Sequence, residues 1–210
     1  RALHYSNGFP RCKTAGLPDH TPPFAEKTVS PDKLRGMLLG TAVGDALGNT
    51  SEGMLPVHRH ERHGRIDSYL PNRYAGFEAV GVPTDDTQLT FWLVEHLLKH
   101  GRLVPEQLAS IFASRQIFGM GSSVREFCRN LKAGMPWQEA GAHSAGNGAL
   151  MRIAPVIGPY VRKPSPQLWE DAAVCSAITH NDPASIACCV GYVFLLSNLL
   201  ADDAVPAADW

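Results

Sequence analysis

Apolar residues recur along most of the 210-residue chain at the three- and four-residue intervals of amphipathic α-helices. Ser30, Pro31 and Asp32 form a helix start, with a capping hydroxyl, a proline at the first helical position and an acid in the first turn. The strict alternation typical of strands is almost absent, with one short candidate at residues 66–70. The pattern predicts an all-α fold, with a helix from residue 31 and others at about residues 86–99, 105–117, 122–132, 147–154, 166–179 and 183–202.

Residues 1–30 differ from the rest of the chain. They carry four prolines and little periodicity, which is typical of an extended arm or loop. The chain shows no internal repeat, and its length favours a single domain. We therefore expect an extended N-terminal arm over residues 1–30 and one helical domain over residues 31–210.

Composition narrows the class of protein. With 44% hydrophobic and 19% charged residues the chain is typical of a globular protein, and its net charge of −1 disfavours nucleic acid as a partner. The five cysteines are odd in number and contain no Cys-x-x-Cys, which favours reduced thiols in a cytosolic protein. The longest apolar run, residues 186–200, is too short to span a bilayer, and the N-terminus has no signal-peptide pattern. These features predict a soluble, cytoplasmic protein without a membrane partner.

Four glycines form a stripe in the first predicted helix. Gly36, Gly40, Gly44 and Gly48 recur at every fourth residue, and each glycine inside a helix costs about 1 kcal/mol relative to alanine. Such a stripe favours close approach of another helix or of a ligand. Asp45 places a polar edge beside it.

Two adjacent aspartates stand directly before an apolar helix in the sequence "TDDTQLT". One interpretation is helix capping, because Asp85 and Gln88 fit the spacing of a capping box. A second adjacent carboxylate is repelled by the first unless a positive charge lies near both. Thr84, Asp85 and Asp86 offer three hard oxygen ligands, which suit Mg²⁺ or Mn²⁺ better than zinc. The stretch is thus a cap or half of a metal site.

Three further stretches carry candidate chemistry: "GDALGNTSE" with Glu52, "HSAGNGALMR" from residue 143, and "ITHNDP" with His180. Each has a structural alternative: Glu52 as a loop acid, residues 144–148 as a turn, and His180 at the end of a helix. The glycine-rich stretch precedes a predicted helix, where backbone N–H groups often hold phosphate, and His180 and Ser144 are suited to a diphosphate or ribose. The run "HRHERH" is better explained by a solvated loop than by a metal site.

The motifs "GMLLGTAVGDALGNTSE", "PTDDTQLT", "GNGALMRIAPV" and "ITHNDP" occur here in one order. With them the chain resembles the ADP-ribosylglycohydrolase family, also called the dinitrogenase reductase-activating glycohydrolase or ARH family, over about residues 33–200. The resemblance implies a compact, orthogonal multi-helix all-α domain with two divalent metal ions, Mg²⁺ or Mn²⁺, in a central cleft. It also implies hydrolysis of the bond at ribose C1 that joins ADP-ribose to a protein side chain or small acceptor. The implied partner is an ADP-ribosylated protein or an ADP-ribose-containing small molecule.

The resemblance implies roles for individual residues. Thr84, Asp85 and Asp86 match the first half of the metal site, and both aspartates count among the catalytic residues. Glu52 matches the family's mobile glutamate, which acts near the anomeric carbon as a base or by stabilising charge there. Substrate-binding positions match Ser144, Gly146, Asn147, Gly148 and His180.

The family's second metal motif, Asp-x-Asp followed by Ser or Thr, is missing from these 210 residues. We therefore expect the helical domain to be incomplete at its C-terminus and this chain alone to bind divalent cations weakly. The resemblance gives Asp45 only a structural role or one beside the metal ligands. No role follows for Met151 or Arg152.

Other classes of function remain open at this point. A catalytically inactive ADP-ribose-binding module needs Ser144, Asn147 and His180 but not Glu52. A His-Asp helical metallophosphohydrolase needs a contiguous His-Asp pair, whereas "THND" places Asn181 between them. A purely structural helical protein would bind no ADP-ribose.

Overall fold

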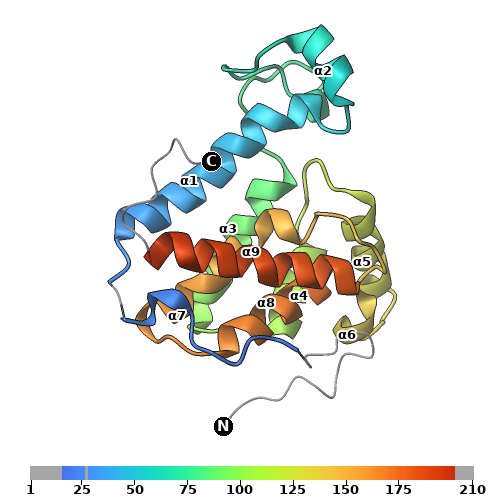
Figure 1. Ribbon diagram of the computed structural model, residues 1–210. Coiled ribbons are helices and arrows are strands. Elements are labelled where there is room, and N and C mark those ends of the chain that lie inside the picture. Colours follow the sequence, from blue (N-terminus) through green and yellow to red (C-terminus); the bar gives the residue numbers. More distant parts are fainter. Residues whose placement is uncertain (1–15, 27, 202–210) are drawn as a thin grey trace.

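The computed structural model describes residues 16–26 and 28–201 (Figure 1). Helices make up the described chain, which contains no strand, so the predicted all-α fold is confirmed. The α-helices are α1 (Pro31–Gly48), α2 (Pro56–His63), α3 (Asp85–His100), α4 (Pro105–Ser114), α5 (Ser122–Lys132), α6 (Trp137–Ala140), α7 (Gly158–Arg162), α8 (Gln167–Ala177) and α9 (Pro183–Ala201). Short 3-10 helices are η2 (Pro23–Glu26), η3 (Asn49–Ser51), η4 (Arg73–Ala75), η5 (Leu150–Arg152) and η6 (Ala154–Ile157).

The long helices begin where their sequence signals predicted. The Ser30 side chain accepts a hydrogen bond from the Asp32 N–H, and Pro31 opens α1. Two local predictions were wrong. The "HRHERH" run is the exposed helix α2 rather than a loop, because Pro56 occupies its first position. The predicted strand at residues 66–70 is replaced by a single bridge between Pro71 and Val80.

A helix predicted over residues 147–154 is also wrong. The segment forms a turn followed by η5 and η6. Pro155 has no N–H to donate to a continuing helix. Gly148 lies against the His180 ring, where an added Cβ would come within 2.7 Å of Cε1.

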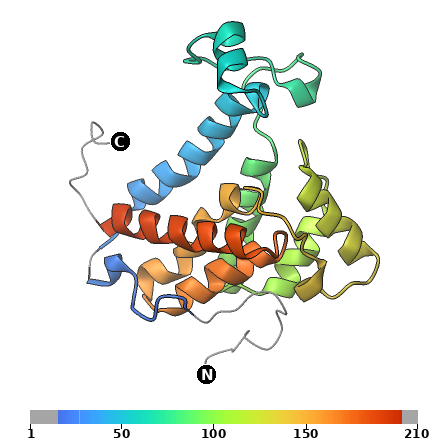
Figure 2. The same ribbon diagram turned by 45° about the vertical axis from the view of Figure 1, so that its right-hand side comes forward.

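The core is centred on α8, which packs along α9 (Figure 2). Nine of the eleven residues of α8 are buried, including Trp169. Full burial of one large apolar side chain contributes roughly 1.5–3 kcal/mol, so this layer is a large contribution to the stability. Phe24 of η2 joins the core, and Trp169 Nε1 donates to the His20 carbonyl at 2.8 Å. Residues 1–15 lie outside the described residues, so the division at residue 30 stays a prediction.

Helix α1 leaves this core and carries residues 49–82 at its far end (Figures 1 and 2). We call residues 49–82, which include η3, α2 and η4, the lobe. Of the eighteen residues of α1 only Ala46 is buried. The four striped glycines are exposed, and a Cβ added to any of them would meet nothing within 4 Å. The predicted close approach to this stripe is therefore absent from the described residues.

Helix α9 has nearly the bounds predicted for it, residues 183–202, and extends beyond the apolar run of residues 186–200 at both ends. By length and composition it is the one helix within residues 16–26 and 28–201 that suffices to cross a membrane. It packs against α8 and η2, with 44% of its most apolar window buried. Core helices pass the same test, so the absence of a membrane partner stays a prediction. Cys128, Cys175, Cys188 and Cys189 are free thiols, and Cys12 lies outside the described residues.

Candidate functional site

A cleft of about 450 Å³ lies between the lobe, the start of α3 and the segment that precedes η5. The lobe contributes one wall through Glu52, Arg73 and Tyr74, and the opposite wall includes His180. Every predicted site residue except Thr84 lines this cleft: Glu52, Asp85, Asp86, Ser144, Gly146, Asn147, Gly148 and His180. Segments more than a hundred residues apart in the sequence thus meet at one site.

The start of α3 is capped from another helix. The Asp45 carboxylate of α1 accepts hydrogen bonds from the Thr84 N–H (2.6 Å), the Thr84 hydroxyl (2.8 Å), the Thr87 N–H (3.1 Å) and the Thr87 hydroxyl (2.7 Å). The capping box of Asp85 and Gln88 was therefore a wrong prediction. Gln88 Oε1 instead accepts from the Phe118 N–H at 2.7 Å. Because Asp45 caps the helix, capping does not explain the adjacent Asp85–Asp86 pair.

Burial and mutual repulsion shift both carboxylates. The pKa of Asp85 is raised to about 7, first by burial and next by the neighbouring Asp86 charge, against backbone N–H groups that lower it. Burial likewise raises the pKa of Asp86 to about 6, with contributions from the Asp45 and Glu52 charges. Glu52, Asp85 and Asp86 line the same cleft and Asp45 lies beside them, so a positive charge there would favour ionisation of both aspartates.

The donor set fits one side of a divalent-cation site. Asp85 and Asp86 offer hard oxygens and form no salt bridge with any described residue, which suits Mg²⁺ or Mn²⁺. Thr84 is only 2% exposed and donates its hydroxyl to Asp45. Among the described residues no group of three or more His, Cys, Asp or Glu side chains is arranged to hold a metal ion. Asp85 and Asp86 alone are therefore fewer donors than a complete metal site needs.

Glu52 is held on the lobe by its neighbours. Tyr74 Oη donates to Glu52 Oε2 at 2.6 Å, and Arg73 Nη1 donates to the Glu52 carbonyl at 2.6 Å. Burial and this hydrogen bond raise the pKa of Tyr74 to about 12, so the phenol stays a donor. The Tyr74 ring meets the Phe118 ring edge-on. Sequence reasoning missed Arg73 and Tyr74, because only the folded lobe brings them to Glu52.

The opposite wall consists of neutral donors around His180. Ser144 Oγ accepts from the Gly146 N–H at 3.2 Å and from Ser123 Oγ at 2.9 Å. Burial lowers the pKa of His180 to about 4, and the Arg152 charge adds to this, so the ring is neutral near pH 7. Gly146 and Gly148 both lie beside this ring, where a Cβ at Gly148 would clash. Packing against the His180 ring therefore explains why these two positions are glycines. No α-helix starts at them.

Arg152 supports the segment that presents His180. It is fully buried, and its Nη2 donates to the Cys175 carbonyl (3.1 Å) and to Thr179 Oγ1 (2.7 Å). Thr179 Oγ1 in turn lies 3.0 Å from His180 Nδ1. Through these contacts the buried Arg152 guanidinium holds His180 in position at the cleft.

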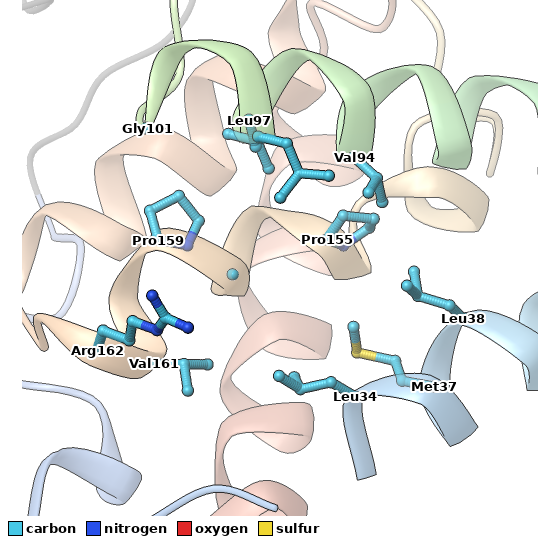
Figure 3. Close-up of a pocket in the computed structure, with 12 residues that line it drawn as sticks. Leu34, Met37, Leu38, Val94, Leu97, Gly101, Pro155, Pro159, Val161 and Arg162 are labelled. Atoms are coloured by element: carbon cyan, nitrogen blue, oxygen red, sulfur yellow. The ribbon is translucent and has the colours of Figure 1, made fainter. Parts of the chain in front are cut away.

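A second cavity, of about 430 Å³, has different chemistry (Figure 3). It lies between α1, α3 and α7, and leucine, methionine, valine and proline side chains dominate its lining. Arg162 is its one charged residue. This hollow lacks the carboxylates and hydrogen-bonding groups of the cleft, so the cleft is the candidate site.

Comparisons with known proteins agree on one family. The sequence model of a family described as ADP-ribosylglycohydrolase matches residues 26–209. An uncharacterised protein of Archaeoglobus fulgidus is 35% identical over 160 residues, which cover 74% of this chain and 52% of that protein. ADP-ribosylarginine hydrolase Tri1 of Serratia proteamaculans is 30% identical over 197 residues, covering 86% of this chain and 51% of the relative.

A solved structure is similar as well. A chain of an "ADP-ribosylglycohydrolase-related protein complex" aligns with a TM-score of 0.61 and 30% identity, covering 81% of this chain and 58% of that one. The present chain therefore spans about half the length of the curated relatives it matches.

Proposed function

The chain belongs to the ADP-ribosylglycohydrolase family, and from this premise we propose that its cleft binds ADP-ribose and hydrolyses the bond at ribose C1. The observation that carries the proposal is the gathering of Glu52, the Asp85–Asp86 pair and the Ser144–His180 wall around one cavity. The acceptor released is a protein side chain. The name of the Serratia relative favours arginine as that side chain.

The wall of neutral donors suits the diphosphate and ribose. Ser144, the backbone around Gly146 and Gly148, and the neutral His180 ring offer hydrogen bonds without a fixed positive charge. Oxygens of ADP-ribose therefore bind here through directional hydrogen bonds, and the ribose end extends toward Glu52 and the two aspartates.

Glu52 is the proposed base. Its carboxylate takes a proton from water, the water oxygen forms a bond to C1, and the bond from C1 to the acceptor breaks with its electron pair going to the acceptor atom. The acceptor then takes up a proton from solvent, and Glu52 releases to solvent the proton that it took from water. Tyr74 fixes one carboxylate oxygen by its hydrogen bond and so orients the base.

Asp85 and Asp86 are the proposed holders of divalent metal, Mg²⁺ or Mn²⁺. When bound, the cations supply positive charge that orients ribose hydroxyls and stabilises charge at the reacting centre. The aspartates bind them as anions, so their raised pKa values make cation binding weaker below neutral pH. The family resemblance includes two such ions, and Asp85 and Asp86 supply ligands on one side only.

The test is release of ADP-ribose from an arginine-ADP-ribosylated protein by the full-length protein and by its E52Q variant. Glu52→Gln is expected to lower turnover by about 10²–10⁴-fold while ADP-ribose affinity stays unchanged. Glu61→Gln, an exposed change on α2 outside the cleft, is the matched control. ADP-ribose binding without any release by the wild type would support an inactive binding module instead. Absence of both would contradict the proposal.

A further inference from the structure

The lobe carries a smaller pocket beside the cleft. Its volume is about 230 Å³, and its lining consists of Thr50, Met54, Arg62, His63, Arg73 and Phe77. A pocket of this size suits one or two side chains, since sites for drug-sized ligands run from about 300 Å³ upward. It lies outside the cleft proposed for ADP-ribose.

Arg73 joins the two hollows, since it lines both. Its guanidinium donates to the Glu52 carbonyl, so the pocket lies on the Glu52 side of the cleft. The Ser144–His180 wall is not part of its lining. Under the proposed function the acceptor leaves C1 next to Glu52, so the polypeptide that bears the modification extends toward this pocket.

The pocket is basic. Two arginines and a histidine line it, and no carboxylate does. Within the part of the chain that the structure describes, the side chains of Arg62 and His63 have no hydrogen-bond or ion-pair partner. The whole chain has a net charge of −1, so general basicity does not explain this cluster. The unpaired Arg62 guanidinium in a concave surface favours a carboxylate ligand, and Arg73, which donates one N–H to the Glu52 carbonyl, has further N–H groups to offer.

The apolar part of the pocket is built under backbone constraint. Phe77 has a φ of 65° and is the one non-glycine residue with positive φ among residues 16–26 and 28–201. This left-handed conformation costs roughly 1–2 kcal/mol and persists where neighbours fix it. The Phe77 N–H donates to the Asn72 carbonyl at 3.0 Å. The ring is 56% exposed and, with Met54, offers a surface for the methylene groups of an acidic side chain.

We propose that this lobe pocket binds an aspartate or glutamate side chain of the target protein, close to the ADP-ribosylated residue. The inference rests on the proposed function for the identity of the target, and it assigns the lobe a part in choosing among targets. Arg62 and Arg73 pair with the carboxylate, and Phe77 contacts its stem.

The first experiment compares R62E with R65E in the full-length protein. Arg65 is exposed, lies three residues further on and is not part of the pocket lining, so R65E makes the same charge change outside the pocket. The substrates are ADP-ribosyl-arginine, an arginine-ADP-ribosylated peptide with flanking glutamates, and the same peptide with glutamines. R62E is expected to raise KM for the glutamate peptide about tenfold, with kcat and the other two substrates unchanged. R65E is expected to leave all three unchanged.

A binding measurement tests the lobe pocket independently of catalysis. Fluorescence anisotropy of the unmodified glutamate peptide is expected to show weaker binding to R62E than to R65E or wild type. If the protein releases no ADP-ribose but this difference is found, the pocket stands and the proposed function fails. Equal losses in R62E and R65E would overturn the pocket, because they would reflect general charge. A loss of ADP-ribose affinity in R62E would also overturn it, because the pocket would then hold the ligand's own phosphates.

Discussion

The two walls of the cleft come from regions that are held together in different ways. Nine of the eleven residues of α8 are buried in the core, whereas α1 buries one of its eighteen. His180 follows α8 directly, and Asp85 opens the core helix α3. Glu52 instead lies on the lobe at the end of α1. One wall is therefore fixed by apolar packing and the other is not.

Polar contacts orient the lobe. Asp45 ties α1 to the start of α3 through four hydrogen bonds. Asn49 Nδ2 and Asn72 Nδ2 both donate to the Val82 carbonyl, at 2.9 and 2.6 Å. Regions with few buried apolar contacts open at lower free energy than the core. The distance between Glu52 and the two aspartates therefore depends on a small number of directional hydrogen bonds.

The largest expected effect is a difference in the free energy of unfolding between apolar substitutions in the two regions. Leu93 of α3 is fully buried, so Leu93→Ala is expected to lower the free energy of unfolding by about 3 kcal/mol through lost burial and a cavity. Leu39 of α1 is 61% exposed, so Leu39→Ala is expected to change it by less than about 0.5 kcal/mol. Urea unfolding measures both. Equal losses would show that α1 packs as tightly as the core.

Removal of the polar link comes next. Asp45→Ala is expected to lower the free energy of unfolding by about 2 kcal/mol, because it leaves the N–H groups of Thr84 and Thr87 without their acceptor. Amide hydrogen exchange is expected to quicken over residues 49–82 while α8 stays protected. Asp32→Ala is the control, since Asp32 lies on the same helix with its side chain 85% exposed. Faster exchange throughout α8 would contradict a separately anchored lobe.

The last expected effect concerns pH. The folded-state pKa of Asp85, about 7, is above its ordinary value of 3.8, so its contribution to stability is present at low pH and is lost as pH rises through 7. Asp85→Asn removes this loss and is expected to be more stable relative to wild type at about pH 8 than at about pH 4. Thermal unfolding across this range measures the difference.

His180 also titrates in this range of pH, but it does so in both proteins. The pKa of His180 is lowered to about 4, so its contribution is lost as pH falls from 6.5 toward 4, and it is common to both proteins. Asp67→Asn, an exposed change on the lobe, is the control. A difference between wild type and Asp85→Asn that does not vary with pH would show that Asp85 is ionised throughout.

Local signals in the sequence predicted much of the fold. Ser30 and Pro31 start α1 as expected, and glycines or prolines mark the ends of most long helices. The candidate site residues other than Thr84 also line one cleft, as expected for four motifs with a common chemistry. The resemblance to the family is confirmed by the match over residues 26–209. The individual roles of the site residues stay predictions.

Long-range contacts were beyond local reasoning. The Asp45–Thr84 contact joins residues 39 positions apart, so the spacing of Asp85 and Gln88 pointed to the wrong cap. Tyr74 reaches Glu52 only because the lobe folds back on itself. The glycine stripe predicted close approach of another helix or of a ligand. The spacing of residues within one helix does not show whether a partner covers that face. Residues 147–154 were predicted to form a helix, but Gly148 lies in a turn that packs against the His180 ring.

A crystal structure of the full-length protein with ADP-ribose would show how the ligand lies in the cleft. We expect the diphosphate at Ser144, Gly146, Gly148 and His180, with ribose C1 between Glu52 and the Asp85–Asp86 pair. ADP-ribose in the apolar hollow between α1, α3 and α7, or in the cleft with its ribose turned away from Glu52, would contradict this expectation.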